Sequence, residues 1–252
     1  MLLHAIAATL ILKFVFPRAD AEERRGHVRE WSLELLEILG IRLEVRGAPP
    51  ARGEKAAMVA ANHVSWLDIF AISAAHPTRF IAKSEIRDWP LAGWIAERAG
   101  TVFIRRERRR DTARINDIVH GVLGQGDTVG LFPEGTTSPG DTLLRFHSSL
   151  FEPAVANRAH VHPCAVRYLR ADGSLCRQVA FVGEISFMQS LGLAIRQRGV
   201  VVQVAFADPI DAEGLDRREV TRRAEAAIAS LLGLPAPGIP PSPGADPPAG
   251  SP

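Results

Sequence analysis

The segment Asn62-His63-Val64-Ser65-Trp66-Leu67-Asp68 contains two side chains whose spacing could support acid–base chemistry. The apolar runs at 58–61 and 69–72 flank it, so we expect a strand, a loop and then a helix. Asp68 would lie in the first turn of that helix, where its carboxylate can accept the ring N–H of His63. This bond would fix the imidazole tautomer, and the other ring nitrogen could act as a base. The pair could then deprotonate an alcohol and reprotonate a thiolate leaving group.

The same segment also has a purely structural interpretation. Ser65-x-x-Asp68 fits a capping box, in which Ser65 is the N-cap of the helix and Asp68 only stabilises the first turn. His63 would then be an ordinary loop residue. The segment by itself leaves both interpretations open.

A second candidate segment is Phe132-Pro133-Glu134-Gly135-Thr136-Thr137-Ser138, which directly follows a β-type run at 129–132. Glu134 would therefore lie in a loop at the carboxyl end of a strand, where open α/β sheets usually bind ligands. Gly135 would let the backbone approach a ligand closely, and the hydroxyls of Thr136 and its neighbour could bond phosphate or glycerol oxygens. The structural alternative is a turn followed by a capped helix.

A third segment, Gly100-Thr101-Val102-Phe103-Ile104-Arg105-Arg106, is a short apolar run that ends in arginines. Arginines at a strand end present guanidinium groups suited to a phosphate. More arginines follow up to Arg114, and a charge run of this kind is usually a solvated face. Together these arginines could attract the chain to anionic lipid or to the phosphates of coenzyme A.

The composition is that of an ordinary globular chain. Its 252 residues can form one large α/β domain with a full-sized core. The hydrophobic content of 46% and charged content of 23% are usual for such a domain. A formal net charge of +2 is too small to indicate a nucleic-acid partner. The two cysteines, Cys164 and Cys176, have neither metal-type spacing nor a framework of pairs, so we expect a reducing compartment.

The elements that must position these segments alternate along the chain. Short β-type runs recur at 41–45, 57–61, 79–82, 101–104, 128–132, 161–168, 178–182 and 200–206. Helical patterns occur at 21–40, from 65, after 111, at 142–157 and around 220–231. The first of these has Val28, Trp31, Leu35, Ile38 and Leu39 on its apolar face, with Gly40 at its end. This alternation predicts an α/β fold with a largely parallel sheet flanked by helices.

The stretch from Met1 to Phe16 is almost wholly apolar but shorter than the roughly 20 residues that span a bilayer. It contains His4 and Lys13, and no small-residue cleavage site follows it. It could lie in the membrane interface, form a marginal anchor, or pack on the protein core. Because it is apolar nearly all round rather than striped, we favour the membrane.

These patterns predict three parts of the chain. Residues 1–40 form an N-terminal helical segment that associates with the membrane, and residues 41–233 form the α/β domain. The Pro-rich residues 234–252 form a disordered tail, because they have no core-forming pattern.

In their order along the chain, the candidate segments resemble the family of 1-acylglycerol-3-phosphate acyltransferases. The family block Asn-His-x-Ser-x-x-Asp is matched by Asn62, His63, Ser65 and Asp68. The blocks Gly-x-Val-Phe-Ile-x-Arg and Phe-Pro-Glu-Gly-Thr are matched at 100–106 and 132–136, and an apolar strand around a proline is matched around Pro163. The four blocks cover roughly 45–206 and favour the catalytic interpretation of the first segment.

The resemblance implies a role for each matching residue. His63 would be the general base and Asp68 its orienting partner. The glycerol-phosphate part of the acceptor would be held by Arg106, Glu134, Gly135 and Thr136. Pro163 would shape the acyl or acceptor pocket, and we place Asn62 and Ser65 among the substrate-binding residues.

The resemblance also implies the substrates and the place of action. A lysolipid would be the acceptor, and acyl-CoA or acyl carrier protein would be the acyl donor, with no metal and no bound cofactor. We expect the chain at the cytoplasmic face of the inner membrane, where the donor is made and where basic residues flank the apolar N-terminal stretch. No nucleic-acid partner is expected.

Two departures from the family pattern bear on the acceptor. The family often has Phe-Lys-x-Gly after the third block, where this chain has Phe146-His147-Ser148-Ser149, and His162 is polar where the family is apolar. The alternative acceptor is another lysolipid, such as a lyso-ornithine lipid. A lipid hydrolase is an alternative of another class, but the chain has no Gly-x-Ser-x-Gly elbow to support a serine nucleophile. A non-catalytic lipid-binding protein would leave the His63–Asp68 pair without a purpose.

Overall fold

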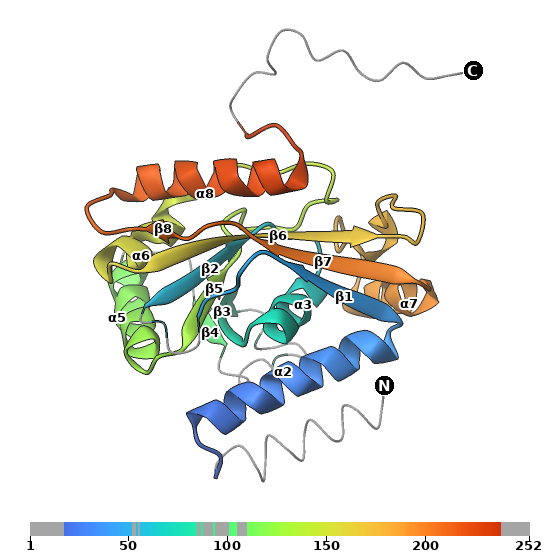
Figure 1. The fold of residues 1–252 in the computed structure, drawn as a ribbon, viewed down its shortest axis with the longest axis horizontal. Coiled ribbons are helices and arrows are strands. Elements are labelled where there is room, and N and C mark those ends of the chain that lie inside the picture. Colours follow the sequence, from blue (N-terminus) through green and yellow to red (C-terminus); the bar gives the residue numbers. More distant parts are fainter. Residues whose placement is uncertain are drawn as a thin grey trace, which may run out of the picture.

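The computed structural model describes residues 18–51, 54, 56–84, 87, 93, 101–104 and 110–237, and the fold below concerns these residues. One twisted sheet lies between two layers of helices (Figure 1). Its strands are β1 (Ile41–Arg46), β2 (Ala57–Ala61), β3 (Thr78–Lys83), β4 (Val102–Ile104), β5 (Thr128–Leu131), β6 (His160–Leu169), β7 (Val200–Phe206) and β8 (Ile210–Asp211). The helices are α2 (Ala21–Ile38), α3 (Leu67–Ala75), α5 (Arg110–Gly124), α6 (Glu152–Ala156), α7 (Phe187–Arg196) and α8 (Arg217–Leu232).

The strand order β1-β7-β6-β2-β5-β3-β4, with β8 paired to β6, confirms the predicted α/β fold with a mostly parallel sheet. The strands from β6 to β4 run parallel to one another, whereas β7 is antiparallel to β6 and carries β1 parallel to itself at the edge. The carboxyl ends of β2 and β5 are therefore neighbours. The loops that follow these two strands contain the first and second candidate segments.

The two faces of the sheet bury separate apolar cores. One core lies under α2 and α3 and includes Leu36, Val59 and Val202; the other lies under α5 and α8 and includes Met58 and Ile228. Figure 1 shows α8 on one side of the sheet and α2 and α3 on the other. Successive residues of a strand point to opposite faces, so the fully buried β2 contributes to both cores.

Helix α2 begins with a capping box in which Asp20 accepts the backbone N–H of Glu23, and the side chain of Glu23 accepts the N–H of Asp20. Gly40 follows its end with a φ of +70°, which a glycine adopts without strain. The predicted apolar face is wrong at one position. Ile38 is 46% exposed, while Leu36, which we did not predict, is 1% exposed and packs into the core.

Two predicted elements are wrong. Residues 142–147 form no helix; the predicted helix is reduced to a 3₁₀ turn, Ser148–Phe151, followed by α6. The reason is that carboxylates hold this backbone in an open conformation, because Leu144 and Phe146 donate their N–H groups to Glu134 and Glu225. The predicted strand at 178–182 is a 3₁₀ turn, Arg177–Val179, and a loop whose Phe181 N–H bonds to the loop after β2.

The apolar stretch from Met1 to Phe16 lies outside the described residues, as do residues 238–252 of the Pro-rich tail. Across the described part of the chain, no helix is both long and apolar enough to cross a membrane. Helix α2, which belongs to the predicted N-terminal segment 1–40, packs against α3.

Candidate active site

His63 and Asp68 lie together at the carboxyl end of β2. The Nδ1 atom of His63 is 2.8 Å from Oδ2 of Asp68, which is fully buried, whereas the His63 side chain is 20% exposed. A carboxylate can only accept at this contact, so Nδ1 carries the proton and donates it. The lone pair of Nε2 is then available to accept a proton.

Asp68 is held from several sides. Its Oδ2 also accepts the backbone N–H groups of Val64 at 2.7 Å and Ser65 at 2.9 Å, and its Oδ1 accepts the hydroxyl of Tyr168 at 2.8 Å. An ionised carboxylate buried without water requires such donors. Asp68 is therefore fixed in position and in turn fixes the imidazole of His63.

The ring of His63 stacks on the ring of Phe132, with centroids 3.9 Å apart and an angle of 12° between the planes. Phe132 in turn stacks on Phe80 at 5.2 Å. The Phe132 ring thus covers one face of the imidazole with apolar surface, and the Phe80 ring packs behind it. The base thus has one face packed, one nitrogen bonded to Asp68, and the other nitrogen without a bond to the described residues.

Glu134 joins the loop after β5 to the loop after β2. Its Oε1 accepts the N–H of His63 at 2.7 Å, and its Oε2 accepts the N–H of Leu144 at 3.0 Å. The side chain is 3% exposed, and burial raises the pKa of Glu134 from 4.5 to about 7. This pKa already includes the two N–H bonds, which lower it, and the charge of Asp68, which raises it.

Further backbone bonds complete this connection. Ser138 donates its N–H to the carbonyl of His63 at 2.7 Å, and His147 donates to the carbonyl of Pro133 at 2.9 Å. On the other side, Phe181 donates to the carbonyl of Val64 at 2.9 Å, while the Thr137 hydroxyl donates to the carbonyl of Phe181. Three loops that are distant in sequence thus form a single support for the imidazole.

Comparisons with known proteins agree with this arrangement. A family model described as Acyltransferase matches residues 42–167, which contain His63, Asp68 and Glu134. The chain is 38% identical over 234 residues to the lyso-ornithine lipid O-acyltransferase of Pseudomonas aeruginosa, a match that covers 92% of this chain and 89% of that protein. It is also 38% identical over 212 residues to the 1-acyl-sn-glycerol-3-phosphate acyltransferase of Neisseria meningitidis, covering 84% and 82%.

The chain belongs to the acyltransferase family. The O-acyltransferase enzymes of this family act on lysolipids. The fold also resembles the crystal structure of the 1-acyl-sn-glycerophosphate acyltransferase from Thermotoga maritima, with a TM-score of 0.65 and 22% identity over 92% of this chain and 94% of that one.

The other predicted site residues of this acyltransferase occupy different environments. Thr136 is exposed beside the imidazole loop, and Gly135 has a φ of +73° in the turn before it, which explains the glycine. Arg106 lies outside the described residues. The contributions of Arg106, Glu134, Gly135 and Thr136 to acceptor binding therefore remain predictions.

Asn62, Ser65 and Pro163 are buried. The side-chain amide of Asn62 donates to the carbonyl of Val166 at 3.0 Å and accepts its N–H at 2.7 Å, so Asn62 joins the end of β2 to β6. Pro163 lies where the neighbour of β6 changes from β8 to β7, a place at which a missing N–H removes no ladder bond. These contacts show that Asn62 and Pro163 support the strands around the site. A direct contact of either residue with substrate remains a prediction.

The expected helix cap at Ser65 is wrong. The N-cap of α3 is Trp66, and the hydroxyl of Ser65 is buried with no hydrogen-bond partner among the described residues. Asp68 does accept the N–H of Ser65, but the same oxygen also bonds the imidazole. The capping-box interpretation thus accounts for one of the four bonds that Asp68 makes.

Tyr168 is the functional candidate that sequence reasoning missed. It is the sole tyrosine of the chain, is 1% exposed on β6, and its hydroxyl donates to Oδ1 of Asp68. Burial raises its pKa well above the ordinary value, with the charge of Asp68 adding to the effect, so the hydroxyl remains a donor. A tyrosine within an apolar strand was a signal, because a buried hydroxyl needs a partner.

Other features of the described residues lie apart from the imidazole. No group of three His, Cys, Asp or Glu side chains within that part of the chain could hold a metal ion. His162, polar where the family is apolar, is buried and lies 2.9 Å from Glu54, which explains the departure. Burial raises the pKa of the Cys164 thiol, so it is a poor nucleophile.

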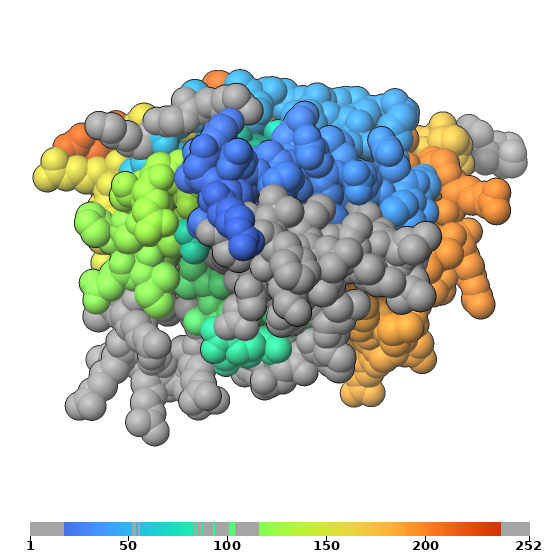
Figure 2. Space-filling model, turned by 90° about the horizontal axis from the view of Figure 1, so that it is seen from below, coloured from blue at the N-terminus to red at the C-terminus, as the bar shows by residue number. Residues whose placement is uncertain are grey.

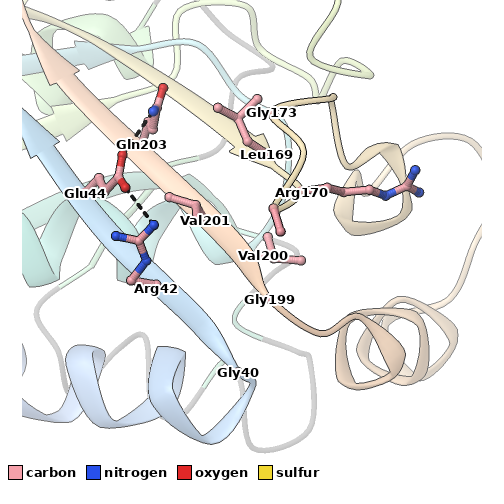
Figure 3. Close-up of a pocket in the computed structure, with 11 residues that line it drawn as sticks. Gly40, Arg42, Glu44, Leu169, Arg170, Gly173, Gly199, Val200, Val201 and Gln203 are labelled. Atoms are coloured by element: carbon pink, nitrogen blue, oxygen red, sulfur yellow. Dashed lines mark hydrogen bonds and ion pairs between the residues drawn. The ribbon is translucent and has the colours of Figure 1, made fainter.

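A pocket of about 520 Å³ lies over the edge strand β1 and its neighbour β7 (Figure 3). Its polar lining is a small network in which Arg42 pairs with Glu44 at 2.9 Å and Gln203 donates to Glu44 at 3.1 Å. These side chains alternate with Ile41 and Val202, which belong to the core under α3. The pocket therefore lies on the sheet face opposite the Phe132 ring that packs on the imidazole, and we do not assign it to the reaction.

Proposed function

We propose that this acyltransferase moves a fatty acyl chain from acyl-CoA or acyl carrier protein to the free hydroxyl of a lysolipid, with His63 as general base. The observation that carries this proposal is the bond from Nδ1 of His63 to the buried Asp68 at 2.8 Å. That bond leaves Nε2 as a base at the partly exposed edge of the site. No bound cofactor or metal is needed in this scheme.

The chemistry follows from the two nitrogens of the imidazole. Nε2 takes the proton of the acceptor hydroxyl while the oxygen attacks the thioester carbonyl, and the resulting imidazolium is stabilised by Asp68. When the tetrahedral intermediate collapses, the C–S bond breaks and the ester forms. The departing thiolate takes the proton back from Nε2. His63 thus ends the cycle neutral, and Asp68 remains a carboxylate throughout.

The first candidate acceptor is 1-acylglycerol-3-phosphate, which would give phosphatidic acid in phospholipid biosynthesis. The neisserial relatives that bear this name support it, at 38% and 39% identity. Thr136 is exposed in the loop after β5, and Arg145 and His147 are exposed beside Leu144, whose N–H bonds Glu134. Their side chains can bond a phosphate. Arg106 would supply a further guanidinium.

The second candidate acceptor is a lyso-ornithine lipid, which has no phosphate. Two observations favour it: the 38% identity to the Pseudomonas aeruginosa protein of that name, and His147 at the place where the family often has a lysine. We propose that either reaction takes place at the cytoplasmic face of the inner membrane, where acyl-CoA and acyl carrier protein are available.

The test incubates the purified protein with labelled acyl-CoA and a panel of lysolipids, and identifies the product by mass spectrometry. A diacyl product supports transfer, whereas free fatty acid alone would indicate a hydrolase and no turnover would indicate a binding protein. The acceptor that gives product decides between the two candidates. With lysophosphatidate as acceptor, Arg106→Ala should raise the KM for the lysolipid about ten- to hundredfold, because a charge-assisted bond to phosphate is lost.

A further inference from the structure

Helix α7 (Phe187–Arg196) lies directly against the loop that carries the base. The indole N–H of Trp66 donates to the Ser190 hydroxyl at 3.1 Å, and the ring of Trp66 meets the ring of Phe187 edge-on at 5.0 Å. Ser190 and Ala194 are the buried positions of the helix. The buried side of α7 therefore packs on Trp66, which is three residues from His63.

The outer face of α7 is apolar where a solvated helix would be polar. Met188 is 69% exposed and Ile195 is 49% exposed. They are seven residues apart, so they lie on one side of the helix, with Gly192 between them. Among the large hydrophobic side chains of the described residues, Met188 is the most exposed.

The charged residues of α7 and of the segment that follows it are arginines, while the nearest acidic residue in sequence, the exposed Glu184, precedes the helix. Residues 185–200 contain no aspartate and no glutamate, but they contain Arg196 and Arg198. Both arginines are exposed, and neither forms an ion pair within the described part of the chain. Apolar side chains flanked by arginines are the pattern of a helix that lies in the interface of an anionic bilayer.

We propose that the outer face of α7 is a membrane contact, in which Met188 and Ile195 enter the acyl boundary of an anionic phospholipid bilayer and Arg196 and Arg198 bind its headgroups. This contact rests on the proposed function, since a lysolipid acceptor resides in the membrane. Figure 2 shows the orange segment that contains α7 on the same face of the molecule as α2. The bilayer would thus contact one side of α7, while the other side of this helix packs on Trp66 near His63.

A fluorescent label tests the contact directly. Met188→Cys carries an environment-sensitive fluorophore; the native Cys164 and Cys176 are buried and should not react. The matched control is Leu231→Cys on α8, which is 38% exposed on the other side of the sheet. With vesicles of phosphatidylcholine and phosphatidylglycerol, the label at 188 should shift to the blue and be quenched by spin-labelled lipid, and the label at 231 should do neither. Vesicle-bound protein with a water-exposed label at 188 would overturn the proposal.

Turnover supplies an independent readout. The double variant Met188→Asp, Ile195→Asp should lower turnover of a vesicle-embedded lysolipid by about tenfold or more, because two charges oppose insertion. Turnover of a short-chain, monomeric lysolipid should fall far less, and Leu231→Asp should change neither. Equal losses on both acceptors would contradict a membrane contact.

The remaining outcomes separate this proposal from the others. Wild-type protein without any acyl transfer would end the proposed function, while the label at 188 would still decide whether α7 enters the bilayer. If light scattering showed a dimer that the double variant dissociates, and the label responded to protein concentration instead of vesicles, the face would be a contact between copies and the membrane proposal would fail.

Discussion

The base of this acyltransferase is defined by hydrogen bonds that surround a buried carboxylate. Asp68 accepts from two backbone N–H groups, one imidazole and one phenol, and each donor comes from a fixed part of the structure. Burial away from water makes these bonds stronger than they would be in solution. The orientation of His63 is therefore set before any substrate binds.

The first prediction concerns the base itself. His63→Ala should lower kcat by about 10²–10⁴-fold, the usual contribution of a general base. Asp68→Asn should also be severely impaired, because an amide can present its NH₂ group to Nδ1 and reverse the tautomer. The fold of His63→Ala should survive, since the residue lies on a partly exposed loop. Correctly folded His63→Ala protein that kept most of its turnover would refute this mechanism.

The second prediction concerns Tyr168 as a positioning residue. Tyr168→Phe removes one donor from Oδ1 of Asp68 without changing the shape of the side chain. The carboxylate then attracts the imidazole proton more strongly, so the acidic limb of the pH profile of kcat/KM should move to higher pH. A bond of about 1.4 kcal/mol corresponds to roughly one pH unit.

The profile distinguishes this role from a purely structural one. If the bond from Tyr168 to Asp68 only stabilised the fold, Tyr168→Phe would lower the free energy of unfolding by about 1–3 kcal/mol for the unpaired oxygen and would leave the profile in place. An unshifted acidic limb in stable Tyr168→Phe protein would exclude the positioning role.

The site depends on loops that the strand order brings together. β2 and β5 are parallel neighbours, so their following loops meet at one edge, and Glu134 connects them by bonding His63 and Leu144 at once. The loop before α7 closes the other side through Phe181. The position of His63 is therefore a property of three elements together.

The third prediction tests this connection. Glu134→Gln keeps one oxygen acceptor, so one of the two N–H groups loses its partner and meets an NH₂ group instead. We expect kcat to fall by roughly ten- to hundredfold, the value of a bond to a charged group. The matched control is Glu225→Gln, whose carboxylate holds the N–H of Phe146 in the same segment but does not touch His63. Equal losses of kcat in both variants would show that the loss comes from the 142–147 segment and not from the bond between Glu134 and His63.

At the scale of the whole molecule, buried ionisable groups make stability depend on pH. The pKa of His76 is lowered from 6.5 to about 4, mainly by burial and also by the charge of His162. The folded protein therefore holds His76 neutral while the unfolded chain takes up a proton below about pH 6.5. Its contribution is present above pH 6.5 and is lost as the pH falls toward 4.

The fourth prediction follows from this sign. His76→Gln preserves a donor toward the Thr128 hydroxyl, which lies 2.9 Å from Nε2, but does not titrate. Urea unfolding should show that the free energy of unfolding of the wild type falls more steeply between pH 6.5 and 4 than that of the variant. The difference should be on the order of 3 kcal/mol at most. Parallel curves for the two proteins would contradict the buried neutral state.

The contribution of Glu134 to the free energy of unfolding depends on pH in the opposite direction. Its pKa is raised in the folded state, so its contribution is lost as the pH rises from about 4.5 through 7. In the Glu134→Gln variant, the free energy of unfolding should therefore depend less on pH between about 4.5 and 7. The same unfolding series measures both effects, because each variant is compared with the wild type at every pH.

Several elements could be predicted from the sequence alone. The strands at 57–61 and 200–206 were predicted with the bounds that the structure shows, since continuous apolar or β-branched runs between turn residues have few other uses. The family blocks also indicated His63 and Asp68 as a pair, and Glu134 as a residue of the acceptor site. Local patterns were sufficient here, because each depends on residues that are close in sequence.

The tertiary structure alone decided the parts that depend on distant residues. The pattern at 142–157 predicted a helix, but Glu134 and Glu225 capture the backbone N–H groups that a helix would use. Tyr168 stands a hundred residues from Asp68, and no periodicity shows that its hydroxyl completes that carboxylate. The sequence determined which groups this acyltransferase contains and where its strands lie. The packing of strands decided which groups meet, because a buried polar atom takes its partner from whatever chain the sheet brings beside it.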